Sequence, residues 1–278
     1  MTHALNGVMR ELDGHTHGLK ARQIKRLEST FRRKVKGKNL VSTPLARHLS
    51  ELSHEFNRQL GVLIDRGGHI RRVIVGDPSR LYLPDIGRAR VGVGRLRGLR
   101  LIRTELRAQA LSNEDLADLS KLRLDAVVAI ELDAHGTMRQ VHWAHLAVLY
   151  EKGFHSKAKT KHTISPEIYT APNLQALPED ALDLITEAEL ELTRFFARDA
   201  KELIRDTAVL VGVHKNRPGV KRHAEDSMAE LQELALTAGI RIVDEVIQIR
   251  RAVDPKTVLG RGKIEELALR ALELGAEV

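Results

Sequence analysis

The stretch AVLVGV at residues 208–213 decides the fold of the second half of the chain. An apolar run of this length without polar alternation is typical of a strand that is covered on both faces, as in a parallel sheet. A helical pattern over 225–238, a second strand pattern over 240–248 and a second helical pattern over 263–274 follow, and a glycine ends each helix. Because right-handed crossover helices join neighbouring parallel strands, this order predicts an α/β domain with a parallel sheet.

The first half of the chain has a different pattern. Two helices with an apolar stripe are expected over 24–35 and 44–60. Short runs rich in valine and isoleucine then alternate with turn residues, which predicts a hairpin over 62–75 and a second pair of strands over 126–145. The first half is therefore predicted to be an α+β domain with a largely antiparallel sheet.

Composition sets the expected domain boundaries. The segment between the two halves is polar and contains four lysines and three prolines, so we interpret it as a linker. The chain is predicted to comprise a mobile N-terminus at 1–19, the α+β domain at 20–150, the linker at 151–178 and the α/β domain at 179–278.

Charge indicates the class of partner. The chain of 278 residues has 45 Lys plus Arg against 37 Asp plus Glu, and nine basic residues face one acid between Lys20 and Lys38. This excess favours a polyanion such as RNA. Aromatic residues are 3% of the chain, too few for platforms that stack single-stranded bases, so duplex or folded RNA suits the surface better.

The residue types that the sequence lacks exclude other classes. The chain has no cysteine, which excludes disulfides, thiolate metal sites and a cysteine nucleophile, and which favours a cytoplasmic protein. No uninterrupted apolar stretch is long enough to cross a membrane.

The last 72 residues carry a series of short motifs in a fixed order. The motifs are Ser227-x-x-Glu230-Leu231, Leu234-Ala235-x-Thr237-Ala238-Gly239, Gln248-x-Arg250, Pro255 and Gly260-x-Gly262-Lys263-x-x-Glu266-Leu267. Their combination closely resembles the N-terminal domain of the HflX family of ribosome-associated GTPases. The first half, with IVGD at 74–77 and GRLRGLRLI at 94–102, is moderately similar to the long extension of some bacterial HflX proteins.

The resemblance implies a function at the ribosome. HflX proteins associate with the large ribosomal subunit in a GTP-dependent way and split stalled ribosomes, so this chain is expected to be their N-terminal part, which binds the ribosome and its RNA. In the family, GTP and Mg²⁺ are bound by a later domain. The sequence has no Gly-x-x-x-x-Gly-Lys-Ser/Thr loop and no Asn-Lys-x-Asp motif, so we expect no cofactor and no GTPase activity in this chain alone.

Residues 276–278 are interpreted as the start of a third strand that truncation interrupts, and a helix that frays after Gly275 is the alternative.

A glycine-rich turn near the end of the chain is a candidate anion site. Gly260-Arg261-Gly262-Lys263 precedes a helix, whose free N–H groups and dipole favour an anion. We expect Gly260, Gly262 and Lys263 to contact backbone phosphate of ribosomal RNA, or a nucleotide, with Arg250 as a second clamp. An ordinary strand-to-helix turn with a solvated lysine is the alternative.

A cluster of arginines in the first half is a second candidate. The Gly/Arg segment from Gly87 to Gly98 is expected to be an exposed loop, and Arg95, Arg97 and Arg100 are expected to meet RNA phosphates. A solvated loop without a ligand is the alternative.

A weaker resemblance concerns residues 103–115. Arg103-Thr104-Glu105 on a strand, followed by Ser112 and Asp115 at a helix start, is similar to the JAMM metalloprotease pattern, in which His-x-His precedes Ser and Asp. Here Arg103 and Glu105 fill both histidine positions, and arginine cannot ligate zinc. The resemblance implies a site without metal, with Ser112 as a helix cap, and we expect no catalytic residues. The alternative functions are a nucleotide hydrolase that uses Lys263 and a metal-dependent peptidase.

Overall fold

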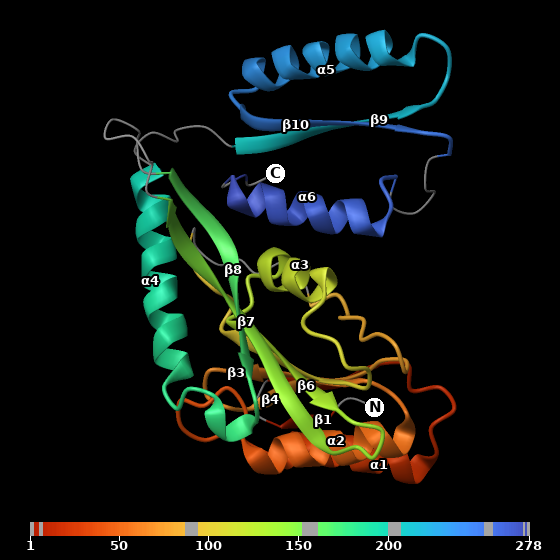
Figure 1. Ribbon diagram of the computed structural model, residues 1–278, viewed down its shortest axis with the longest axis vertical. Helices are drawn as coiled ribbons and strands as arrows, with labels where there is room; N and C mark the ends of the chain where they lie inside the picture. Colours follow the sequence, from red (N-terminus) through yellow and green to blue (C-terminus); the bar gives the residue numbers. More distant parts are fainter. Residues whose placement is uncertain are drawn as a thin grey trace. The chain divides into compact units, whose positions relative to one another are not determined.

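The computed structural model describes residues 3–5, 8–86, 94–151, 161–199, 207–252, 258–274 and 276 (Figure 1). The chain divides into two compact units. Unit 1 comprises residues 1–146 and 166–190, and unit 2 comprises residues 147–165 and 191–278. The division cuts three elements: the last residues of β7 (Met138–Glu151) and α4 (Ala181–Asp199) and the first residues of β8 (Lys161–Ala171) belong to unit 2.

An eight-stranded sheet runs through unit 1 in the order β1-β2-β4-β3-β5-β6-β7-β8. The pairs β2–β4 and β5–β6 are parallel, whereas β1–β2, β3–β4, β3–β5 and β6–β7 are antiparallel. The strands are β1 His3–Leu5, β2 Val8–Gly14, β3 Leu60–Asp65, β4 Ile70–Val75, β5 Leu99–Glu105, β6 Ala126–Leu132, β7 Met138–Glu151 and β8 Lys161–Ala171. The α+β class is confirmed, but the sheet is mixed. A helix connects β5 to β6, and such a crossover makes the two strands parallel.

The helices around this sheet begin and end where the local sequence dictates. Pro44 lies in the first turn of α2, and Asn57 ends that helix in the left-handed conformation with φ 50°. Ser112 caps α3, since its side chain accepts a hydrogen bond from the Asp115 N–H. The helices are α1 Ala21–Ser29, η1 Thr30–Arg32, α2 Thr43–Phe56, α3 Asn113–Lys121, η2 Leu174–Ala176 and α4 Ala181–Asp199. Within the described residues, no helix is both long and apolar enough to cross a membrane.

Residues 8–14, which we expected in a mobile N-terminus, form β2. The strand pairs in parallel with β4, and the Arg72 guanidinium lies 2.7 Å from a Glu11 carboxylate oxygen and 3.1 Å from one of Asp13. Gly14 ends the strand with φ 87°, where an added Cβ would lie 2.1 Å from the Val75 carbonyl oxygen. The residues of β4 that pair with β2 are about sixty positions away in the sequence, so no local sequence pattern predicts this strand.

Residues 161–171, which we expected in a linker, form β8. This strand is the last in the sheet order, so one of its edges has no neighbouring strand in the described part of the sheet. An edge strand tolerates a proline, because one row of its N–H groups has no ladder partner. Pro166 therefore fits within β8, although prolines led us to predict irregular chain here.

Unit 2 contains a layer of two parallel strands between two helices (Figure 1). The strands β9 Thr207–Lys215 and β10 Arg241–Arg250 pair from Thr207 opposite Arg241 to Lys215 opposite Arg250, with one register shift between Ile242 and Asp244. Helix α5, Val220–Thr237, buries Ala224 and Met228, and α6 spans Arg261–Glu273. The predicted α/β order is thus present. The start of a third strand, expected at 276–278, falls on positions of which only Ala276 is described, outside any helix or strand.

A buried histidine joins α2 to the segment before it. The His48 ring lies 3.0 Å from the Thr30 hydroxyl through Nε2 and 3.2 Å from the Arg33 guanidinium through Nδ1. Because guanidinium can only donate, Nδ1 accepts and Nε2 carries the proton that is donated to Thr30. Burial, and then the charges of Arg33 and Arg26, lower the pKa of His48 to about 4. The ring is therefore neutral at pH 7.

This histidine predicts a loss of stability in acid. The unfolded chain binds a proton at an ordinary histidine below about pH 6.5, whereas folded His48 does not until about pH 4. Stability should therefore fall as the pH drops through this window, by about 1–2 kcal/mol after allowance for solvent screening. Urea unfolding of the wild type and of His48→Gln at pH 7 and pH 4.5 measures it. The variant should lose less stability than the wild type on acidification, and equal losses would refute this account.

Candidate functional site

The carboxyl ends of β9 and β10 bring cationic side chains together in unit 2. Arg250 ends β10 opposite Lys215, which ends β9. Gly260 precedes α6 with φ 77°, and a Cβ added there would lie 3.1 Å and 3.2 Å from the two terminal nitrogens of Arg250. The guanidinium thus rests against Gly260, and glycine is needed both for the backbone conformation and for this close approach.

The first turn of α6 begins at the same edge. The Ile264 N–H donates to the Gly260 carbonyl oxygen over 3.2 Å, so the N–H groups before it have no partner within the helix. Lys263 pairs with Glu266 over 2.6 Å on the helix surface. Gly262 has open space around the position of a Cβ, so sterics do not require glycine there. The arrangement combines N–H donors, the positive end of a helix and a guanidinium, which suits a phosphate group.

The sequence reasoning missed Lys215. Its signal was available, because the carboxyl ends of neighbouring parallel strands meet at one edge of a sheet, where ligands of α/β proteins bind. Further exposed cations follow the ends of the two strands: Arg217, Lys221, Arg222 and Arg251.

The arginine segment of unit 1 is held in place by two buried carboxylates. The Leu96 N–H donates to Glu189 over 2.9 Å, and the Gly98 N–H donates to Asp125 over 2.9 Å. The expected loop is therefore anchored over its described part, while residues 87–93 lie outside the described residues. Arg95 is exposed, and Arg97 is half-buried and donates to the Ile86 carbonyl oxygen over 2.5 Å.

Arg100 does not belong to this surface. It is 1% exposed, and its guanidinium donates to the backbone carbonyl oxygens of Leu40 over 2.7 Å, Asp65 over 2.8 Å and Asn39 over 3.4 Å. Burial lowers the pKa of Arg100 to about 10, so the side chain stays charged at pH 7. The expectation of a phosphate contact was wrong, because a cluster of arginines in the sequence does not reveal which of them a strand turns inward.

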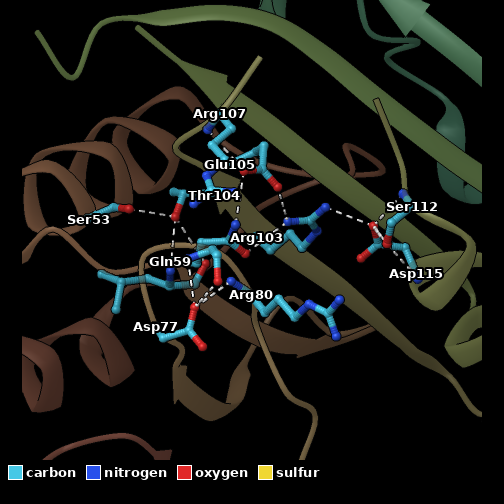
Figure 2. Close-up of polar contacts among 12 residues, drawn as sticks. Ser53, Gln59, Asp77, Arg80, Arg103, Thr104, Glu105, Arg107, Ser112 and Asp115 are labelled. Carbon is cyan, nitrogen blue, oxygen red and sulfur yellow. Dashed lines mark hydrogen bonds and ion pairs between the residues drawn. The ribbon is translucent and has the colours of Figure 1, made fainter. Parts of the chain in front are cut away.

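The four residues of the weaker resemblance do come together (Figure 2). The Arg103 guanidinium lies between two carboxylates, 2.8 Å from Glu105 and 2.7 Å from Asp115. The Ser112 hydroxyl donates to Asp115 over 2.7 Å, and the Gln59 amide donates to Glu105 over 2.9 Å. Arg103, Glu105 and Asp115 are buried, whereas Ser112 is exposed, and the Arg103 cation already neutralises the two carboxylates. In the described part of the chain, no group of three or more His, Cys, Asp or Glu residues is placed to hold a metal ion.

Comparison with known proteins finds relatives of the C-terminal segment. A family model described as "GTP-binding GTPase N-terminal" matches residues 225–278. A GTPase HflX of Lacrimispora saccharolytica is 45% identical over 73 residues, which cover 26% of this chain and 16% of the relative. This segment is similar to HflX GTPases. A GTPase HflX of Alkalihalophilus pseudofirmus is 37% identical over 70 residues, which cover 25% of this chain and 16% of the relative.

The aligned part spans about a sixth of the length of these HflX relatives. The residues that the family model matches, 225–278, include β10, α6 and most of α5, and therefore the edge at which Arg250 meets Gly260. No solved structure matches the chain.

The role of Arg100 predicts a large loss of stability on its replacement. Arg100→Met keeps the aliphatic stem but leaves the buried Leu40 carbonyl group and two part-buried carbonyl groups without this donor, so the free energy of unfolding should fall by about 2–4 kcal/mol. Arg95→Met removes an exposed charge and should change it by less than about 0.5 kcal/mol. Chemical denaturation measures both variants, and equal effects would show that Arg100 is not a structural residue.

The Arg103 cluster predicts that the protein carries no zinc. Because arginine fills one position between the carboxylates, purified protein should contain less than about a tenth of an equivalent of zinc. Elemental analysis after dialysis against zinc tests this. Stoichiometric zinc that is lost in Asp115→Asn would contradict the structural role of the cluster.

Proposed function

We propose that this chain is the ribosome-binding and RNA-binding part of an HflX-type protein. The observation that carries the proposal is the coincidence of the HflX-like segment with the cationic edge formed by Arg250, Gly260 and Lys263. The relatives that share this segment are named GTPases, and the resemblance implies that they act on the large ribosomal subunit. Cytoplasmic location is part of this proposal.

Each residue of the edge has a proposed role. The Arg250 guanidinium supplies a two-pronged donor for backbone phosphate of ribosomal RNA. Gly260 allows the close approach of backbone and guanidinium, and Gly262 leaves room for the phosphate beside the first turn of α6. Lys263 adds positive charge once the anion replaces Glu266 as its partner. In unit 1, Arg95 and Arg97 are proposed to make further phosphate contacts.

GTP and Mg²⁺ are not assigned to residues of this chain. In the proposal they belong to the GTPase domain of the full-length family, and this chain supplies affinity for the ribosome. Hydrolysis of GTP by this chain alone is therefore not expected.

The salt dependence of ribosome binding tests the proposal. Each phosphate that a side chain neutralises contributes roughly 0.7–0.9 to the slope of log affinity against log salt. Arg250→Gln/Lys263→Gln should therefore lower the slope by about one to two for large subunits in a co-sedimentation series.

A control variant separates a local effect from a general effect of charge. Arg194→Gln/Arg241→Gln removes the same charge from exposed positions of unit 2 away from the Gly260 turn. It should keep the wild-type slope. If both double variants and the wild type give one slope, the Arg250 edge does not contact the ribosome.

A further inference from the structure

Unit 1 carries a second cationic surface, outside the segment that matches HflX proteins. It lies on α1, η1 and the residues that follow, where nine basic residues and one acid occur between Lys20 and Lys38. The exposed cations of this surface are Arg22, Lys25, Arg32, Lys34 and Lys36, and Arg47 of α2 is exposed as well. We call these six side chains the α1 surface.

The positive charges of the α1 surface are not neutralised by carboxylates of the described part of the protein. Arg26 pairs with Glu55, and Lys38 pairs with Asp183, so two of the nearby carboxylates are already engaged. Among the described residues, no carboxylate lies within ion-pair distance of any of the six side chains of the α1 surface. The surface therefore keeps its net positive charge in the folded protein.

Folding alone does not require this distribution. The apolar side of α1 buries Leu27, and the opposite side could equally carry glutamates. The first turn of α1 has no acidic residue, although acids are favoured at the positive end of a helix.

Contacts with α2 fix the elements that carry most of these cations, α1 and η1. Three contacts hold α1 and η1 antiparallel to α2: Arg26 pairs with Glu55 near the end of α2, the Thr30 hydroxyl bonds to His48, and Arg33 donates to the Pro44 carbonyl oxygen over 3.4 Å. Figure 1 shows the two helices side by side. Side chains on a fixed pair of helices lose less conformational freedom on binding than those on a loop.

We propose that the α1 surface binds the phosphate backbone of duplex RNA. Between residues 20 and 56 the phenylalanine, tyrosine and tryptophan rings are Phe31, which is half-buried, and Phe56, which is buried, so the surface offers no exposed ring of these types on which unpaired bases would stack. Backbone contacts without base stacking are typical of duplex recognition. The identification of the ligand as RNA rests on the proposed function, whereas the exposure and the positive charge of the α1 surface do not depend on it.

Binding of a 20-base-pair RNA duplex of arbitrary sequence, without ribosomes, tests the α1 surface. Fluorescence anisotropy at several salt concentrations compares the full chain with Arg22→Gln/Lys25→Gln/Arg32→Gln. We expect the triple variant to bind at least tenfold more weakly near 0.1 M salt, and its log–log slope to be lower by roughly two to three.

The control is Arg107→Gln/Lys121→Gln/Arg139→Gln, which removes the same charge from exposed positions elsewhere in unit 1. It should bind RNA nearly as the wild type does. Equal losses in the two triple variants would overturn the proposal, as would binding of polyglutamate as tight as that of the duplex, because the surface would then be a general site for acidic polymers. Arg250→Gln/Lys263→Gln in the same assay distinguishes the α1 surface from the edge at Arg250. The reduction in duplex affinity that the α1 substitutions cause should be the same in this background, even if the double variant no longer binds ribosomes.

Discussion

The guanidinium of Arg66 holds four separated segments of unit 1 together. From the turn between β3 and β4, it lies 2.7 Å from Asp125, which precedes β6, and 2.8 Å from Glu189 on α4. The same two carboxylates accept the N–H groups of Leu96 and Gly98, before β5. Because the two carboxylates are buried, loss of Arg66 would leave their charges uncompensated and would weaken the attachment of both the arginine segment and the helix.

Arginine has two distinct uses in unit 1, and the difference determines what could bind RNA. Arg100 and Arg103 are buried and satisfy carbonyl groups or carboxylates of the protein itself. Arg22, Arg32 and Arg95 are exposed. Net charge therefore overstates the charge that is available to a partner, and only the structure separates the two groups.

Local pattern predicted the second half of the chain well. The apolar run at 208–213 lies in β9 Thr207–Lys215, and the expected strand at 240–248 is β10 Arg241–Arg250, because an uninterrupted apolar run and crossover helices specify a parallel layer. The approach of Arg250 to Gly260 also followed from the order of strand and helix. Three features could not be predicted, because they depend on parts of the chain that are distant in sequence. Strand β2 forms because it pairs with the strand that carries Arg72, and β8 forms at the edge of the sheet. The burial of Arg100 depends on the carbonyl groups to which it donates.

The central claim is that one set of arginines contacts RNA, while the arginines that are bonded to buried carboxylates or to carbonyl groups of the protein maintain the fold. Arginine-selective modification, read by mass spectrometry with and without large ribosomal subunits, tests it most directly. The account predicts that Arg22, Arg32, Arg95 and Arg250 react in the free protein and are protected by the ribosome, and that Arg100 and Arg103 react in neither state. Reactivity of these first four arginines that does not change on ribosome binding would contradict the account.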